Sequence, residues 1–144
     1  MPSIDTTFTR AEWTLLVRVP GQVVTAATAA GQDQGAGTVA QALAGLDAIA
    51  AGRGSPNALV RQVVGAIYAE RDAEAGPLGG REAVLDACRQ AARIIAGHSL
   101  EDRDAYRDWV LWAAERVCAA GGPGDTPGDA GQRLLADLAT ALGG

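Results

Sequence analysis

The chain contains no lysine, and its twelve basic residues are all arginines. These arginines are spread along the sequence among seventeen acidic residues, which leaves a net charge of −5. A protein that follows a phosphate backbone needs a basic stripe, so this distribution predicts neither nucleic-acid binding nor a polybasic membrane anchor. Without lysine there is also no Walker-type phosphate loop and no Schiff-base or pyridoxal chemistry.

Aromatic residues make up only 4% of the chain, whereas alanine and glycine are abundant. The length of 144 residues fits a single domain, which we expect to span residues 1–144 with an N-terminal arm at 1–8. The hydrophobic content of 48% is enough to form a core without a metal or a disulfide. No basic segment leads into an apolar run with a cleavage site, and no stretch is apolar enough to span a bilayer. We therefore expect a cytoplasmic protein with no membrane partner.

The two cysteines, Cys88 and Cys118, fall inside predicted helices. If those helices form an antiparallel hairpin, the rise of about 1.5 Å per residue places the two sulfurs roughly 15 Å out of register. That separation is too large for a disulfide, so we expect two buried free thiols.

Helix signals dominate the sequence and strand signals are missing. The stretch "TRAE", Thr9 to Glu12, is a capping box, and Ser55 followed by Pro56 is typical of a helix start. Pro20 is expected to interrupt the first helix. Apolar spacing and breakers predict seven segments, at residues 10–19, 22–30, 38–52, 55–76, 80–98, 102–120 and from 126 onward. The expected fold is all-α, a single compact globule of about seven short helices.

Apolar residues recur at helical spacing in four segments and predict their buried faces. They are Leu59, Val60, Val63, Val64 and Ile67 in 55–76, Val84, Cys88, Ala91 and Ile95 in 80–98, Trp109, Val110, Ala113 and Val117 in 102–120, and Leu134, Leu135, Leu138 and Leu142 from 126 onward.

Two further segments have features of their own. The segment 22–30 carries no charge, so we expect it to be the central and most buried helix. In the segment 38–52, Val39, Leu43 and Leu46 form one apolar stripe.

The two ends of the domain also resemble each other, each with a helix, a polar glycine loop and a second helix. Leu43 and Leu46 in "QALAGL" match Leu135 and Leu138 in "RLLADL". The match is consistent with an internal duplication or with chance similarity between alanine-rich helices.

No motif in the sequence indicates a catalytic reaction. The stretch "GHSLE" differs from a nucleophile elbow at its last position, Glu101, and His98 is the only histidine in the chain. Ser99 is therefore interpreted as a helix cap. His98 could join neighbouring acids as a metal ligand, but no second histidine motif accompanies it. We expect no metal and no cofactor.

The segment that follows alternates acids with arginines. The carboxylates are Asp102, Asp104 and Asp108, and the arginines are Arg103 and Arg107. We interpret them as a solvated face with charge pairs four residues apart rather than as general acids or bases.

The polar loops resemble those of the tellurite-resistance-B-like (TerB-like) all-helical domain, with the ending "DAGQRLLADLATALGG" after the second loop. In that family, acids of such loops can bind a divalent cation. The first loop here, "GQDQGAG", has Asp33 but no following glutamate, and the second has Asp125 and Asp129 but no "DG". The resemblance thus implies a metal site whose ligands are incomplete, with Asp125 and Asp129 as the remaining candidates.

Trp112 lies between Asp108 and Arg116 on the polar side of its predicted helix. In the preferred interpretation it packs internally, with its indole N–H on Asp108 and Arg116 over the ring. In the alternative it is an exposed anchor for a partner, and the same two alternatives apply to Trp13.

These observations favour a non-enzymatic helical module that binds a protein partner or a second copy of itself. The alternative is an accessory protein that holds a small apolar ligand in a pocket between its small-residue helices.

Overall fold

The structure is a computed structural model that describes residues 8–31, 38–69, 80–121 and 129–143. These ranges contain α-helices and one short 3-10 helix, with no strand among the described residues, so the predicted all-α class is confirmed. The elements in chain order are α1 (Arg10–Gly31), α2 (Thr38–Ala51), η3 (Gly52–Gly54), α3 (Ala58–Ala69), α4 (Arg81–Ala96), α5 (Leu100–Gly121) and α6 (Asp129–Gly143).

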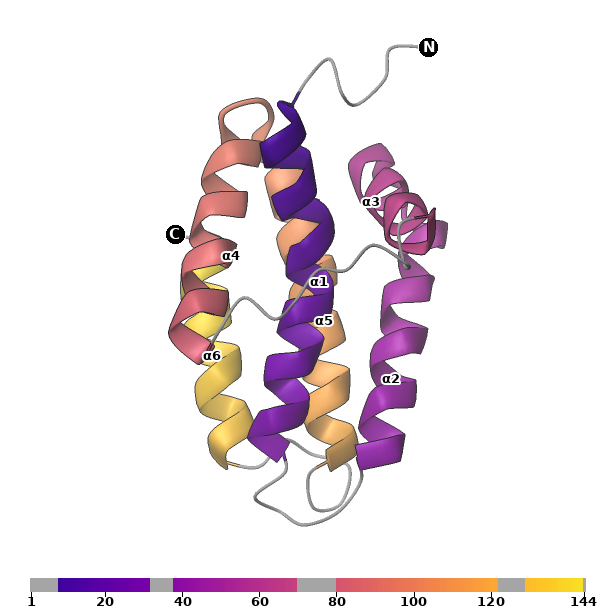
Figure 1. The fold of residues 1–144 in the computed structure, drawn as a ribbon, viewed down its shortest axis with the longest axis vertical. Helices are drawn as coiled ribbons and strands as arrows, with labels where there is room; N and C mark the ends of the chain where they lie inside the picture. Colours follow the sequence, from indigo (N-terminus) through magenta and orange to yellow (C-terminus); the bar gives the residue numbers. More distant parts are fainter. Residues whose placement is uncertain (1–7, 32–37, 70–79, 122–128, 144) are drawn as a thin grey trace.

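Helices α1 and α5 form the centre of the molecule (Figure 1). Helices α4 and α6 lie on one side of this pair, and α2 and α3 lie on the other. Both central helices contact elements on each side, and the most extensive helix pair is α2 against α5. Among the helices of the described ranges, none combines the length and apolar composition that a membrane span requires.

The first two predicted segments are one helix, because α1 continues through Pro20 without ending. Proline has no N–H, so the carbonyl of Leu16, four residues earlier, loses its helical donor. The hydroxyl of Tyr106 on α5 donates to this carbonyl at 2.7 Å, and the Tyr106 side chain is fully buried. The predicted break was therefore wrong, since a tertiary hydrogen bond replaces the one that proline removes.

The uncharged half of α1 is central, as predicted, but it is not buried on all sides. Val23 and Ala27 are fully buried, whereas Gly21, Thr25 and Ala29 form an exposed strip. The Thr25 hydroxyl donates to the carbonyl of Gly21 within the same helix. This part of α1 can therefore face solvent although it carries no charged side chain, because the threonine hydroxyl forms a hydrogen bond within the helix.

Helix α2 packs with its small residues inward and turns Leu43 and Leu46 of the predicted apolar stripe outward. Its buried face includes Gly45 and Ala48, while Leu43 and Leu46 face outward. A Cβ atom at Gly45 would lie 2.6 Å from a methyl carbon of Val24 on α1. The close contact with the Val24 side chain therefore requires glycine at position 45, and the larger Leu43 and Leu46 lie on the outer face.

The end of α2 is held by a side chain of α5. Ala48 carries one of the last four carbonyls of α2, which have reduced access to helical donors. The indole Nε1 of Trp109 donates to this carbonyl at 3.2 Å. Gly52 lies beside the same indole, and a Cβ there would be 2.8 Å from Nε1 and 2.5 Å from Val64. The buried Trp109 thus both caps α2 and fixes the turn that leads into α3.

The remaining predicted apolar faces are confirmed. The buried residues that the sequence pattern placed on these faces are Leu59, Val60, Val63 and Val64 of α3, Val84, Cys88, Ala91 and Ile95 of α4, Trp109, Val110, Ala113 and Val117 of α5, and Leu134, Leu138 and Leu142 of α6. The proposed equivalence of α2 and α6 is not matched by their packing, since Leu43 is 57% exposed and its counterpart Leu135 is half-buried.

The helix starts show both a success and a correction. The amide of Thr9 donates to the Glu12 carboxylate, and the amide of Glu12 donates to the Thr9 hydroxyl, so the capping box is confirmed. Ser55, however, does not cap α3. The side chain of Asn57 accepts from the amide of Val60 and takes that role, so Pro56 precedes the helix rather than opening it.

Candidate functional site

Trp112 is exposed on α5, which contradicts the preferred prediction of internal packing. Its side chain is 42% exposed, and the Arg116 guanidinium carbon lies 5.2 Å from the ring centroid. The predicted cation–π contact is thus confirmed, but the predicted acceptor for the indole is wrong. The Asp108 carboxylate accepts from Nε of Arg107 at 3.0 Å instead.

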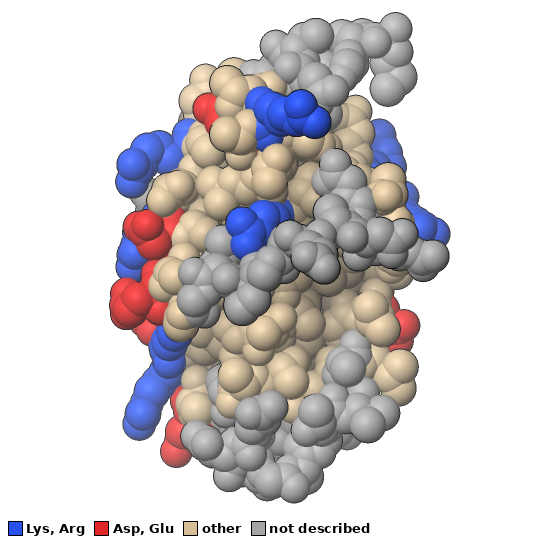
Figure 2. Space-filling view, viewed as in Figure 1, with Lys and Arg blue, Asp and Glu red and all other residues tan. Residues whose placement is uncertain are grey.

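A second exposed apolar surface lies on the outer face of α2. We call it the α2 strip and define it by Leu43 and Leu46, which are 57% and 59% exposed. Asp47 is the sole charged residue of α2. Figure 2 shows that charged side chains gather on the side of α4 and α6, whereas the lower part of this face, over α1 and α2, is mostly uncharged. The sequence pattern identified these leucines as part of one apolar stripe, and the structure places them on the surface.

Trp13 belongs to an aromatic cluster rather than to an isolated surface position. It is half-buried and lies 6.4 Å from Phe8, measured between ring centroids. The ring of His98 meets Phe8 edge-on at 4.8 Å. Phe8 is buried in the core cluster, so these contacts attach the start of α1 to the turn between α4 and α5. This arrangement favours a packing role for Trp13 and His98.

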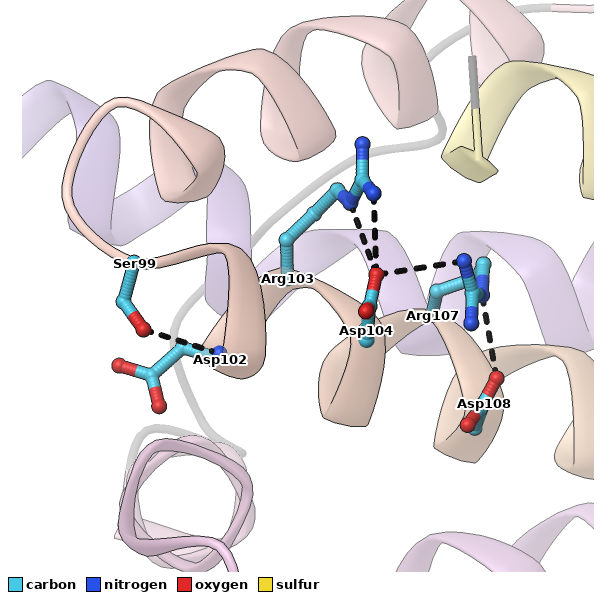
Figure 3. Close-up of polar contacts among 6 residues, drawn as sticks. All are labelled: Ser99, Asp102, Arg103, Asp104, Arg107 and Asp108. Carbon is cyan, nitrogen blue, oxygen red and sulfur yellow. Dashed lines mark hydrogen bonds and ion pairs between the residues drawn. The ribbon is translucent and has the colours of Figure 1, made fainter.

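The first turns of α5 carry a chain of polar contacts (Figure 3). The Ser99 hydroxyl accepts from the amide of Asp102, which confirms Ser99 as a helix cap. Arg103 and Arg107 both donate to the same oxygen of Asp104, at 3.0 and 3.3 Å. The charge pairs are therefore one and three residues apart, not four as predicted. Asp104 and Asp108 each form an ion pair with an arginine (Figure 3). Such paired carboxylates are typical of a structural charged surface.

The candidate metal ligands do not come together in the described part of the chain. No group of three or more histidine, cysteine, aspartate or glutamate side chains there could hold an ion. Asp129 is exposed at the start of α6 and His98 contacts Phe8, while Asp33 and Asp125 lie outside the described residues.

Both cysteines are free and buried, as predicted. Burial raises the pKa of the Cys88 thiol to about 12, although the nearby Arg89 acts in the opposite direction. Burial likewise raises the pKa of Cys118 to about 11. Thiols that stay protonated are poor nucleophiles and poor metal ligands, so the two residues have a packing role.

A cleft of about 360 Å³ lies between α4, α5 and α6. Three arginines line it, Arg89 and Arg93 from α4 and Arg103 from α5. This site was not predicted from the sequence, because its arginines come from separate parts of the chain. The spacing of Arg89 and Arg93, four residues apart on one helix, was the available signal.

Comparisons with protein-family models, with curated proteins and with solved structures found no match for this chain. The resemblance to the tellurite-resistance-B-like domain therefore stays a prediction.

Proposed function

We propose that this chain is a non-enzymatic helical interaction module that binds an apolar helix through its α2 strip, and that a second copy of the chain serves as the partner. The observation that carries the proposal is the exposure of Leu43 and Leu46 by more than half on an α-helix whose opposite face is packed against α5. Large apolar side chains that gather on a surface mark interaction sites more often than single exposed ones do.

The spacing along α2 indicates what kind of partner fits. Positions 39, 43, 46 and 50 are occupied by Val, Leu, Leu and Ala, at intervals of four, three and four. This is the interval pattern of a helix–helix seam. A two-fold pair of α2 helices running antiparallel would place Leu43 of one copy near Leu46 of the other, so the strip is complementary to itself.

The expected affinity is modest. Full burial of a leucine stabilises by about 1.5–3 kcal/mol, and these side chains are already partly buried, so each would add about 1–2 kcal/mol. Association itself costs about 4–15 kcal/mol in lost freedom. Four leucines would together contribute about 4–8 kcal/mol, which offsets only the lower end of the association cost, so we expect a weak dimer that forms at high concentration. Exposed Trp112, on the helix that α2 packs against, offers a second apolar anchor beside Arg116.

Sedimentation velocity over a wide concentration range tests this proposal. We expect a monomer–dimer equilibrium that Leu43→Glu with Leu46→Glu abolishes and Trp112→Ala weakens. Leu100→Glu is the matched control, because Leu100 is 62% exposed at the start of α5, outside the strip. A chain that is monomeric at every concentration would overturn self-association, as would equal effects of Leu100→Glu and of the strip variants.

A small-molecule-binding function is the second candidate, and the cleft between α4, α5 and α6 is the observation that favours it. Its lining differs from the apolar pocket expected from the sequence, because three arginines contribute to it. The tellurite-resistance-B-like resemblance remains a further proposal. Its divalent-cation site would require Asp125 or Asp129, so unchanged cation binding after Asp125→Asn and Asp129→Asn would contradict that site.

A further inference from the structure

The cleft between α4, α5 and α6 concentrates positive charge in an acidic protein. Three of the twelve arginines line it, although the chain carries a net charge of −5. The other lining residues are Ala92, Ala96, Ala141 and Thr140, so no acid among the described residues lines the cleft. The side of the molecule that holds it is opposite α2 with respect to the central helices (Figure 1), which separates it from the α2 strip.

The three guanidinium groups differ in how far acids neutralise them. Arg103 donates two hydrogen bonds to Asp104, but Asp104 also accepts from Arg107 (Figure 3). Arg89 lies 3.8 Å from Asp86, at the outer limit of an ion pair. Arg93 has no ion pair with any residue of the described ranges. Positive charge and hydrogen-bond donors therefore remain available around the cleft.

This arrangement costs stability when the cleft is unoccupied. Arg89 and Arg93 are four residues apart on α4, where two like charges on neighbouring turns destabilise a helix. Arg103 brings a third positive group to the same space from another helix. An anion in the cleft would offset this repulsion, because each guanidinium would then also face an opposite charge.

We propose that this cleft binds a small organic oxyanion, a phosphate monoester or a carboxylate with a short apolar body. Planar guanidinium groups match oxyanions in geometry and charge, which accounts for the arginines. The alanine side chains provide an apolar surface for the body of the ligand. The volume of about 360 Å³ lies at the lower end of ligand sites, so the ligand is small. This inference does not rest on the proposed self-association.

Phenyl phosphate is a suitable probe, followed by amide chemical shifts of the labelled full chain. We expect saturable shifts confined to α4, α5 and α6, weaker binding of inorganic phosphate, and no binding of phenol. Binding of phosphate as tight as that of phenyl phosphate would overturn the role of the apolar surface. Absence of saturable binding by either anion, or shifts centred elsewhere, would overturn the site.

Two arginine variants separate a specific site from general charge. Arg93→Gln removes the unpaired guanidinium and is expected to weaken phenyl phosphate binding by about tenfold, as for loss of a charge-assisted hydrogen bond. Arg61→Gln removes the same charge from the exposed face of α3, on the other side of the central helices, and is expected to change affinity less than about twofold. Equal weakening by both variants would show only non-specific attraction. Because Arg93 is exposed, its variant should retain the wild-type circular dichroism spectrum.

Discussion

Replacement of Tyr106 by phenylalanine tests whether a tertiary hydrogen bond allows α1 to continue through a proline. The Tyr106 hydroxyl is fully buried and donates to the carbonyl of Leu16 at 2.7 Å. Pro20 cannot donate to that carbonyl, so Tyr106→Phe leaves it without its buried partner. An unsatisfied buried acceptor costs about 1–3 kcal/mol, and we expect the free energy of unfolding to fall by that amount.

A double-mutant cycle with Pro20→Ala isolates the cause. Alanine restores an N–H at position 20, and this group can donate to the Leu16 carbonyl as in an ordinary helix. We therefore expect Tyr106→Phe to cost about 1 kcal/mol less in the Pro20→Ala background than in the wild type. The coupling should be visible even if Pro20→Ala changes stability on its own.

Urea unfolding followed by circular dichroism provides the measurement, with the midpoint shifting at constant slope. Tyr68→Phe is the control, since Tyr68 is half-buried with its ring under the Arg53 guanidinium, and it should change stability by less than about 0.5 kcal/mol. The same loss for Tyr106→Phe in both backgrounds would refute the reasoning, as would a Tyr106→Phe variant as stable as the wild type.

Two further predictions concern packing and the thiols. Gly45→Ala should destabilise the fold by about 1–3 kcal/mol, because the new Cβ would lie 2.6 Å from Val24. Gly65→Ala, with open space around it, should instead stabilise the fold by about 0.5–1 kcal/mol. Thermal unfolding of both variants checks this prediction, and effects of the same sign would contradict it. Burial raises the pKa values of Cys88 and Cys118 from 9.0 to about 12 and about 11. Their contribution to stability is therefore complete below pH 9 and is lost as pH rises toward 12. The thiols of the folded protein should resist alkylation at neutral pH, and rapid labelling would disprove their burial.

The amphipathic helices were predictable because a single physical signal decides them. In α4, Val84, Cys88, Ala91 and Ile95 recur at helical spacing among charged residues, and burial of the apolar face follows directly. The capping box of Thr9 and Glu12 was equally local, since both hydrogen bonds lie within four residues.

The candidate sites were less predictable because they depend on residues distant in sequence. The cleft requires α4, α5 and α6 to meet, and Arg103 is ten residues from Arg93 in the chain but shares its space. The sequence pattern correctly placed Arg116 over Trp112, because residues four apart on a helix are neighbours. It wrongly favoured burial of the Trp112 ring, because burial depends on which other helices cover that side of α5.

The sequence by itself determined the all-α class, the apolar faces of four helices and the protonated, buried thiols, because periodicity and composition act locally. Only the tertiary structure decided that α1 passes through Pro20 and that α2 turns its leucines outward. A hydroxyl from α5 replaces the missing N–H in the first case. In the second, a side chain larger than glycine at position 45 would collide with Val24 of α1, so the small-residue face of α2 packs inward and Leu43 and Leu46 are left on the surface.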